Sequence, residues 1–274
     1  MKERYDIVII GGGIAGVSAA LSCRNRGKSA AVVANGAQTS SLYKAESITN
    51  YPGVPSTSGK LLSEILLRQL ADSGAELIRG RALSVIPLGE SFGVAVGSEF
   101  TTCSALILAT GITREKLYPG EGEFLGRGVS YCATCDGMLY RGKTVAVVGS
   151  GEEAAHDADF LESIGCTVLR MKKPLRYEIC GGIKAETLLA EGEEHKVDAV
   201  FIIKDTVSVT TLVPGLEVSG GAIVTDRQMR TNIPGVFAAG DCTGKPYQLA
   251  KAAGEGNVAA LSACAYIDNK EKEK

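Results

Sequence analysis

Short apolar runs that end in glycine-rich turns form the clearest pattern along the chain. The first run, Asp6–Ile10, leads into Gly11–Gly16, and a helix rich in small residues is predicted from there to about Arg26. A second apolar run follows at Ser29–Ala34. A strand, a glycine turn, a helix and another strand in this order open a β-α-β unit. The pattern therefore predicts an α/β fold at the start of the chain.

The same unit occurs again in the middle of the chain. Thr144–Val148 leads into Gly149–Ala154, with a helix predicted to about Ile164 and a strand at Cys166–Met171. Two openings of this kind predict two Rossmann-like domains of the three-layer FAD/NAD(P) type.

Two further apolar strands end in glycine turns and belong with the first unit. Ala105–Ala109 precedes Thr110-Gly111, and Gly235–Ala239 precedes Gly240-Asp241 near the end of the chain. The simplest arrangement is a first domain made of residues 1–115 and 229–274, with a second, shortened domain of residues 116–228 inserted into it. Both boundaries fall in loop-like stretches.

Composition limits the classes of function. A chain of 274 residues with 45% hydrophobic content can bury a large core, and a net charge of −2 gives no sign of a nucleic-acid or membrane partner. The sequence enters a strand at once, with no apolar leader or membrane-length run. Eight cysteines without a secretory signal predict a reducing, cytoplasmic location, where a CxxC pair is more often catalytic or metal-binding than structural.

The first glycine turn has the requirements of a dinucleotide site. Gly11 allows a tight turn, Gly13 lets the backbone approach a pyrophosphate, and Gly16 lets the helix and strand pack closely. The helix N-terminus then offers free N–H groups to the phosphates. The acidic residue that would hold the ribose of NAD after the second strand is replaced by Ala34-Asn35. This favours FAD over NAD at the first turn.

The second candidate site is a pair of thiols, Cys132 and Cys135, followed directly by Asp136. Two thiols at this spacing can cycle between a disulfide and a dithiol, one attacking a partner disulfide and the other resolving the intermediate. The departing sulfur needs a proton, and Asp136 is the nearest candidate acid. A zinc site is the structural alternative, but no second CxxC or Cys/His pair completes one, so no metal is expected.

These motifs occur in the order seen in a known family. The segments that resemble the low-molecular-weight thioredoxin reductases are Gly11–Gly16, Ile48–Gly53, Ala109-Thr110-Gly111, Gly126–Ser130, Cys132–Gly137 and Gly235–Asp241, and the run GRGVSYCATCDG is highly specific. The resemblance covers most of the chain. It implies an FAD enzyme that reduces thioredoxin through the Cys132–Cys135 disulfide and works as a homodimer. It also implies that Cys135 faces the flavin and that Cys132 is more exposed to the partner.

Further site residues follow from the same resemblance. Asp241 would bind the ribityl chain of the flavin, following Gly240 in the turn. The remaining residues would line the FAD cleft or lie beside the isoalloxazine: Asn50, Thr110, Gly111, Gln248, Leu249 and Ala250. The family usually has an Arg-Gln pair where this chain has Tyr247-Gln248.

The second glycine turn departs from the family pattern. Glu152 and Glu153 stand at the start of its helix, where carboxylates would repel a pyrophosphate. No HRRxxxR run for the 2′-phosphate of NADPH follows the next strand, although Lys172, Lys173 and Arg176 could imitate one. Only about twenty residues, 177–196, separate Arg176 from the strand predicted at 197–203. That length is too short for the helix and strands with which the family completes its nucleotide domain.

These departures are similar to the ferredoxin-dependent flavin thioredoxin reductases, which lack the pyridine-nucleotide signature. We therefore expect ferredoxin as the donor, with NADPH binding at a degenerate site as the alternative. A flavin-binding regulatory protein without turnover is a third alternative, of another class. Ferredoxins are usually acidic, so basic residues would assist docking. The candidates are Lys172, Lys173, Arg176 and Lys184.

Overall fold

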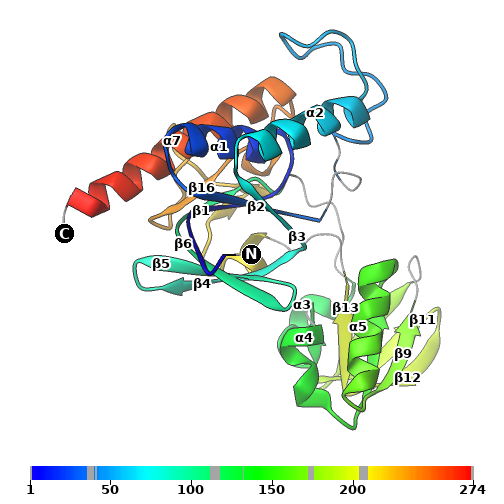
Figure 1. Cartoon of the computed structure of the whole chain (residues 1–274). Coiled ribbons are helices and arrows are strands. Elements are labelled where there is room, and N and C mark those ends of the chain that lie inside the picture. Colours follow the sequence, from blue (N-terminus) through cyan, green and yellow to red (C-terminus); the bar gives the residue numbers. More distant parts are fainter. Residues whose placement is uncertain are drawn as a thin grey trace. The chain divides into compact units, whose positions relative to one another are not determined.

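The computed structural model describes residues 2–35, 40, 42–111, 118–131, 133–171, 176–203 and 209–272, without the side chains of residues 135, 152 and 153. The chain divides into two compact units (Figure 1). Unit 1 comprises residues 1–113 and 207–274, and unit 2 comprises residues 114–206.

A seven-stranded sheet forms the centre of unit 1. Its strands follow the order β3-β2-β1-β6-β5-β4, and β16 pairs with the second half of β6. The strands β1, β2, β3, β6 and β16 are parallel, whereas β4 and β5 form an antiparallel meander with the first half of β6. Their bounds are β1 Arg4–Ile10, β2 Ala30–Ala34, β3 Glu76–Arg79, β4 Ala82–Leu88, β5 Ser91–Val96, β6 Glu99–Leu108 and β16 Val236–Ala238.

Helices cover one face of the parallel strands, and the meander lies on the other (Figure 1). The helices are α1 Ile14–Asn25, α2 Gly59–Asp72 and α7 Leu249–Lys272. Small residues let α1 and α7 approach each other closely, because a Cβ on Gly256 of α7 would stand 2.2 Å from the carbonyl oxygen of Ala15. Ser18 Oγ donates to the carbonyl of Ala253 across the same interface at 2.7 Å. Close packing of this kind fixes the start of α1 against the C-terminal helix.

The chain returns to unit 1 at Val207, which is 22 residues earlier than the boundary expected at residue 229. The helix α6 Val209–Leu212 packs against β4, and β15 Ala222–Ile223 packs against η3 Asp241–Thr243. β14 Val218–Ser219 pairs with β15. Elements this short have no measurable hydrophobic period, so the sequence pattern does not assign them to either domain.

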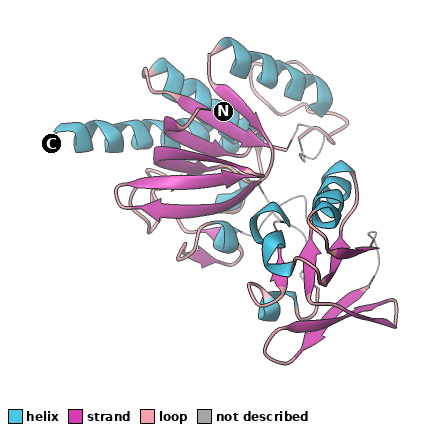
Figure 2. Cartoon of the chain, turned by 60° about the horizontal axis from the view of Figure 1, so that its bottom comes forward, coloured by secondary structure: helices cyan, strands magenta, loops and turns pink. Residues whose placement is uncertain are grey.

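Unit 2 is a smaller parallel sheet with one long helix (Figure 2). Its strand order is β7-β13-β8-β9, and α5 Glu152–Ser163 connects β8 to β9. The remaining bounds are α3 Glu121–Phe124, β7 Val129–Ser130, α4 Ala133–Asp136, η2 Gly137–Tyr140, β8 Thr144–Val148, β9 Thr167–Met171 and β13 Ala199–Ile202. The prediction of two Rossmann-like α/β units, the second one small, is confirmed by this topology.

The segment of residues 177–196 contains strands that the sequence did not predict. It forms a three-stranded antiparallel sheet of β10 Tyr177–Gly181, β11 Ala185–Ala190 and β12 Glu193–Lys196. The segment is too short for a helix as well as strands, but it accommodates three strands because the β11–β12 connection takes only two residues. Glu191 and Gly192 form this two-residue turn, with φ angles of 51° and 91°. The segment contains strands only and no helix.

Among the described residues, no helix combines the length and apolar character that crossing a bilayer requires.

Candidate active site

The first glycine turn connects β1 to α1. A Cβ on Gly11 would stand 2.1 Å from the carbonyl oxygen of Ala109, and a Cβ on Gly16 would stand 1.8 Å from the carbonyl oxygen of Gly11. Only glycine fits these two positions. Gly13 differs, because a Cβ there would meet no protein atom within 4 Å. The first turn of α1 contains no acidic residue and its N-cap makes no side-chain hydrogen bond. The turn therefore presents unpaired backbone N–H groups to open space at Gly13.

The other predicted cofactor residues lie at the same edge of the sheet. Gly11, Thr110 and Gly240 each follow the carboxyl end of a parallel strand, namely β1, β6 and β16, and these strands are neighbours. Ligands of open α/β sheets bind at this edge. Gly111 has a φ of +70° and faces open space. The buried Thr110 hydroxyl has no hydrogen-bond partner of ordinary geometry, although it helps to lower the pKa of the neighbouring Cys242 thiol, which burial raises overall.

A cluster of polar contacts holds the turn after β16. Lys251 Nζ donates to the carbonyls of Gly240 and Gly244 at 3.1 and 2.9 Å, and it is 3.0 Å from Glu255 Oε2. The same carboxylate oxygen accepts the backbone N–H of Gly240 and the hydroxyl of Thr243, both at 2.9 Å. Lys251 and Glu255, one helical turn apart on α7, therefore fix the turn from which Asp241 projects.

Sequence reasoning missed Lys251 and Glu255. Their spacing of four residues on a helix is the usual spacing of an exposed ion pair, which carries no functional signal. In the structure each side chain is 18% exposed, so the pair is mostly buried. Burial raises the pKa of Asp241, Lys251 lowers it and Glu255 raises it further, leaving it above the ordinary value.

Asn50 and Gln248, which lie far apart in the sequence, are in contact. Asn50 Nδ2 donates to Gln248 Oε1 at 3.0 Å. Gln248 directly precedes Leu249 and Ala250, the first two residues of α7. The predicted flavin-contacting residues at the start of α7 and in the Asn50 loop thus belong to one region of unit 1.

The redox-active motif lies in unit 2 between β7 and η2. Cys132 and the side chain of Cys135 fall outside the described residues, whereas the rest of the short helix α4 is described. Ala133 is fully buried. The Ser130 hydroxyl donates to Asp136 Oδ2 at 2.7 Å, which connects the end of β7 to the end of α4. The motif is therefore framed by a hydrogen bond between the residues on either side of the two cysteines.

A second contact fixes the residue immediately before Cys132. The Tyr131 hydroxyl donates to Glu121 Oε1 at 2.6 Å, and the other oxygen of this fully buried carboxylate accepts the N–H of Tyr118 at 2.8 Å. Burial and the Glu121 carboxylate both raise the pKa of Tyr131 well above its usual value. The phenol is therefore a neutral donor at physiological pH, and its role here is to hold the chain.

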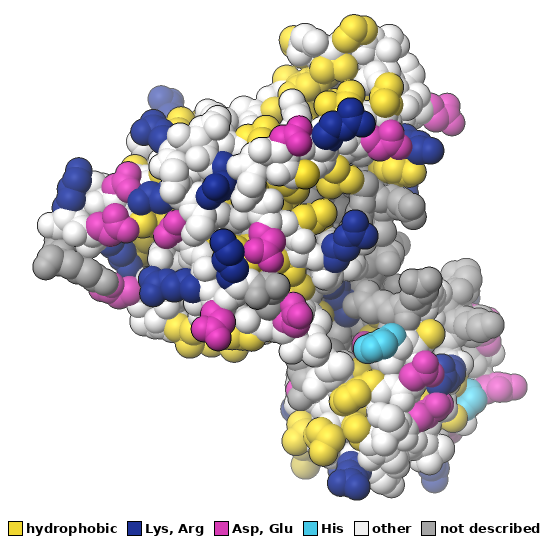
Figure 3. All heavy atoms as spheres, in the orientation of Figure 1, with side chains coloured by type: hydrophobic (Ala, Val, Ile, Leu, Met, Phe, Trp, Pro, Cys, Tyr) yellow, Lys and Arg dark blue, Asp and Glu magenta, His cyan; other side chains and the backbone are white. Residues whose placement is uncertain are grey.

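Exposed apolar side chains follow the motif. Met138 and Leu139 of η2 are 57% and 71% exposed. Figure 3 shows hydrophobic atoms gathered on the lower part of unit 2. Large apolar side chains this exposed next to a candidate redox centre are typical of a surface that meets another protein.

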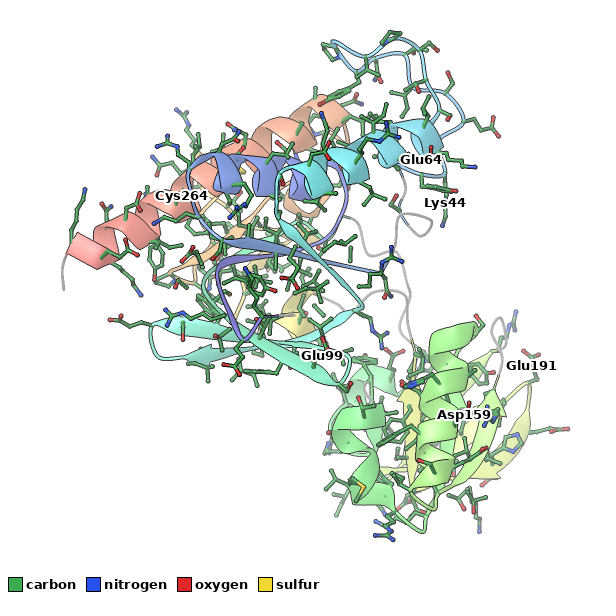
Figure 4. All side chains as sticks on the ribbon, viewed as in Figure 1. Lys44, Glu64, Glu99, Asp159, Glu191 and Cys264 are labelled. Atoms are coloured by element: carbon green, nitrogen blue, oxygen red, sulfur yellow. The ribbon has the colours of Figure 1, made fainter. Side chains whose placement is uncertain are left out.

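The second glycine turn does not have the properties of the first. A Cβ on Gly149 would press on Ile203 at 2.9 Å, so this glycine serves the packing of β8 against β13. Arg170 on β9 is already engaged: its guanidinium is 2.7 Å from Asp159 and 2.8 Å from Glu162, both on α5. Figure 4 labels Asp159 on this helix. The Arg170 guanidinium is therefore already paired with two carboxylates.

The basic residues proposed for docking do not all gather. Lys172 and Lys173 lie outside the described residues. Arg176 stands at the start of β10, beside Glu191 (labelled in Figure 4), whereas Lys184 lies in the turn between β10 and β11, 3.9 Å from Asp198. A strand of five residues separates them, on the order of 16 Å of extended chain. Arg176 and Lys184 are thus at opposite ends of one hairpin.

Within the described part of the chain, no three His, Cys, Asp or Glu side chains are grouped so that they could hold a metal ion. The side chain of His156 is 78% exposed on α5.

Comparison with known proteins agrees with the fold and the motifs. The family model described as pyridine nucleotide-disulphide oxidoreductase matches residues 5–178 and 176–256. A thioredoxin reductase of Treponema pallidum is 33% identical over 98% of this chain and 99% of its own. A ferredoxin-flavin thioredoxin reductase from Clostridium acetobutylicum is 40% identical with a TM-score of 0.88, covering 98% of this chain and 99% of that one. A thioredoxin reductase from Gloeobacter violaceus is 30% identical with a TM-score of 0.80, covering 98% and 95%.

The fold, the glycine turn and the CxxC motif thus define a flavoprotein of the pyridine nucleotide-disulphide oxidoreductase class. Within that class the chain belongs to the thioredoxin reductase family. Proteins of this family depend on FAD, as the sequence analysis expected. The residues of unit 1 fit this cofactor, because Gly13 leaves space beside unpaired N–H groups and Thr110 offers a hydroxyl without an ordinary partner.

Proposed function

We propose that this protein reduces the disulfide of thioredoxin through Cys132 and Cys135, with electrons supplied by reduced ferredoxin through FAD. The observation that carries the choice of donor is the second glycine turn itself, because Glu152 and Glu153 begin the helix that follows it and Arg170 is paired with Asp159 and Glu162. Both features disfavour the binding of a nucleotide phosphate at this turn. The likeness to the ferredoxin-flavin thioredoxin reductase of Clostridium acetobutylicum supports the same choice.

Ferredoxin delivers one electron at a time, whereas reduction of a disulfide takes two, and bound FAD would hold both electrons until the disulfide is reduced. The residues proposed to hold it are those assembled at the carboxyl edge of the unit 1 sheet. The N–H groups at Gly13 and the start of α1 would face the pyrophosphate, and Gly11 would allow the tight turn that brings them there. Asp241 would accept from the ribityl hydroxyls. Further contacts would come from Asn50, Thr110, Gly111, Gln248, Leu249 and Ala250.

The disulfide exchange balances within the motif. Two electrons and two protons convert the Cys132–Cys135 disulfide to a dithiol. Cys132 gives up its thiol proton to solvent, and its Sγ bonds to one sulfur of the partner disulfide as that S–S bond breaks; the departing sulfur takes a proton that Asp136 can deliver. Cys135 Sγ attacks Cys132 Sγ of the mixed disulfide, which releases the second partner sulfur as a thiol. The Cys132–Cys135 disulfide is restored.

The energetics permit ferredoxin as the source. A plant-type ferredoxin near −400 mV and a thioredoxin near −270 mV differ by about 130 mV, or roughly 6 kcal/mol for two electrons. Electron transfer from ferredoxin to thioredoxin is therefore downhill. No hydride from a nicotinamide is required to drive the reaction.

The exposed Met138 and Leu139 supply a surface on which the partner can dock. They follow Cys135 within four residues, so a protein whose disulfide reached the motif would cover them. Burying the apolar surface of these two side chains favours association by about 25 cal/mol per Å² before the entropic costs of association are subtracted. The inserted unit thereby combines the reactive pair with an apolar contact for thioredoxin.

The experiment that tests the donor is an anaerobic titration of the FAD-loaded protein, followed by the flavin absorbance. Reduced ferredoxin is expected to bleach the flavin and to support reduction of thioredoxin, whereas NADPH and NADH at the same concentrations are expected to leave it oxidised. Cys132→Ser should keep bleaching by ferredoxin but abolish thioredoxin reduction. Rapid stoichiometric bleaching by NADPH would contradict the proposal and favour an NADPH enzyme with an altered site.

We also infer a homodimer from the family resemblance and a cytoplasmic location from the cysteine content. Light scattering of the FAD-loaded protein is expected to give twice the mass of 28.5 kDa. A mass of one chain would contradict the dimer.

A further inference from the structure

The hydrogen bond between Ser130 and Asp136 joins two residues that flank the reactive motif from opposite sides. Ser130 ends β7, two residues before Cys132, and Asp136 ends α4, directly after Cys135. The Ser130 hydroxyl donates to Asp136 Oδ2 at 2.7 Å, and Ser130 is only 7% exposed. A short hydrogen bond from a buried donor to a carboxylate is among the stronger polar contacts that a side chain can make.

Ser130 is itself rigidly held. β7 pairs in parallel with β13, and Ser130 lies opposite Phe201, which is fully buried. The preceding residue, Val129, is also buried, and the following residue, Tyr131, is fixed by Glu121. A hydroxyl on this support has little freedom, so it restricts the rotation of the Asp136 carboxyl group to which it donates.

We propose that Ser130 is a positioning residue that orients the Asp136 carboxyl for proton transfer at the Cys132–Cys135 pair. By donating to Oδ2, Ser130 leaves Oδ1 as the oxygen that carries and exchanges the proton. This inference rests on the proposed function of Asp136 in disulfide exchange. When Asp136 gives its proton to the departing sulfur, an S–H bond forms as the O–H bond at Oδ1 breaks, and the negative charge remains on a carboxylate that the Ser130 hydroxyl stabilises. The carboxyl group regains a proton from solvent or from the second thiol before the next cycle.

The test uses the full FAD-loaded protein, photoreduced without oxygen and mixed with oxidised thioredoxin, so that it does not depend on the natural donor. Thioredoxin thiols are counted by alkylation after an acid quench. Ser130→Ala is expected to lower the rate constant at saturating thioredoxin by about tenfold without changing KM, and Asp136→Asn by about a hundredfold. Ser130→Thr retains the hydroxyl and is expected to stay within about twofold of the wild type.

A double variant separates positioning from a general structural effect. If Ser130 acts through Asp136, adding Ser130→Ala to Asp136→Asn should lower the rate by less than about twofold. Ser163→Ala is the matched control, because Ser163 of α5 also donates a hydroxyl, to the carbonyl of Phe160 at 2.6 Å, but stands outside the motif. It is expected to react at the wild-type rate, and thermal melting of each variant checks that the fold is kept.

The outcomes separate the two levels of the argument. If the photoreduced wild type leaves thioredoxin oxidised, the proposed function fails and the inference fails with it. If the wild type reduces thioredoxin and Ser130→Ala is equally fast, the inference alone is wrong. It is also wrong if Ser130→Ala has the same tenfold effect in the Asp136→Asn background, or if Ser130→Thr is as slow as Ser130→Ala.

Discussion

The two glycine turns of this chain read alike in the sequence and differ in their surroundings. The first stands where three parallel strands end together, with open space at Gly13 and no acidic residue in the first turn of α1. The second stands in a four-stranded sheet, where Gly149 is needed for packing and Arg170 is bound by two carboxylates. The difference shows that a strand–turn–helix motif specifies the shape of the backbone, whereas ligand binding also depends on the residues and the open space around the turn.

The largest effect is expected from filling the closest contact of the first turn. Gly16→Ala would put a Cβ 1.8 Å from the carbonyl oxygen of Gly11, so the backbone must move. We expect a loss of about 3 kcal/mol or more in the free energy of unfolding, together with the loss of bound FAD. Chemical unfolding and the ratio of flavin to protein absorbance measure both.

Gly254→Ala is the matched control for that change. Gly254 lies in α7 with no atom near its missing side chain, so alanine there should stabilise the helix by up to about 1 kcal/mol. If Gly16→Ala kept full flavin content and stability, the first turn would not have the tight geometry on which the comparison depends.

The second prediction changes the open glycine of each turn in parallel. Gly13→Ala meets no protein atom, so the apoprotein should keep its stability, but a methyl group in the space for the pyrophosphate should weaken FAD binding by about ten- to a hundredfold. Gly151→Ala should cost about 1 kcal/mol of stability because the φ of Gly151 is +89°, without changing FAD affinity. Fluorescence titration of the apoproteins with FAD measures the affinities.

An unchanged FAD affinity in Gly13→Ala would contradict the assignment of the first turn as the FAD site. If the wild type showed NADPH-driven flavin reduction and Gly151→Ala lost it, the second turn would be a nucleotide site as well.

A third prediction concerns Asp241, whose pKa is raised mainly by burial. A carboxyl group with a folded pKa above its unfolded pKa favours folding below the unfolded value. That contribution is lost as pH rises through the folded pKa. Asp241→Asn should therefore raise the Tm of the apoprotein at pH 7 but not at pH 3, while weakening FAD binding about tenfold. Calorimetry of the apoprotein at both pH values is the measurement. An equal Tm shift at both pH values would show that the charge is not the cause.

The sequence predicted the strands that end at the site better than the residues that support it. β1, β6, β8 and β16 were found because fully buried parallel strands are continuous apolar runs. Lys251 and Glu255 were missed because their importance comes from burial against the Gly240 turn, a tertiary contact. Asn50 and Gln248 were each expected near the flavin only from family resemblance, and their contact was not predicted, since 198 residues separate them.

The three strands within residues 177–196 were not predicted, for a related reason. The turn at Glu191-Gly192 uses a left-handed conformation that glutamate rarely adopts, so the sequence carries no strong hairpin signal there. The hydrogen bond between Ser130 and Asp136 could not be predicted either, because no helix or strand periodicity places two residues six positions apart across this motif in contact.

The smallest effect is expected at Arg170, and it tests the second turn most directly. Its guanidinium and both of its carboxylate partners are largely solvent-exposed, so Arg170→Gln should change the Tm by no more than about 2 °C. It should leave ferredoxin-driven turnover unchanged. The informative companion is Asp159→Asn combined with Glu162→Gln, which frees the guanidinium. If a free cation were all that the turn lacked, this variant would gain flavin reduction by NADPH that Arg170→Gln cannot show. We expect no such gain, because the turn also carries Glu152 and Glu153 at the start of α5, where a pyrophosphate would need its N–H groups unopposed.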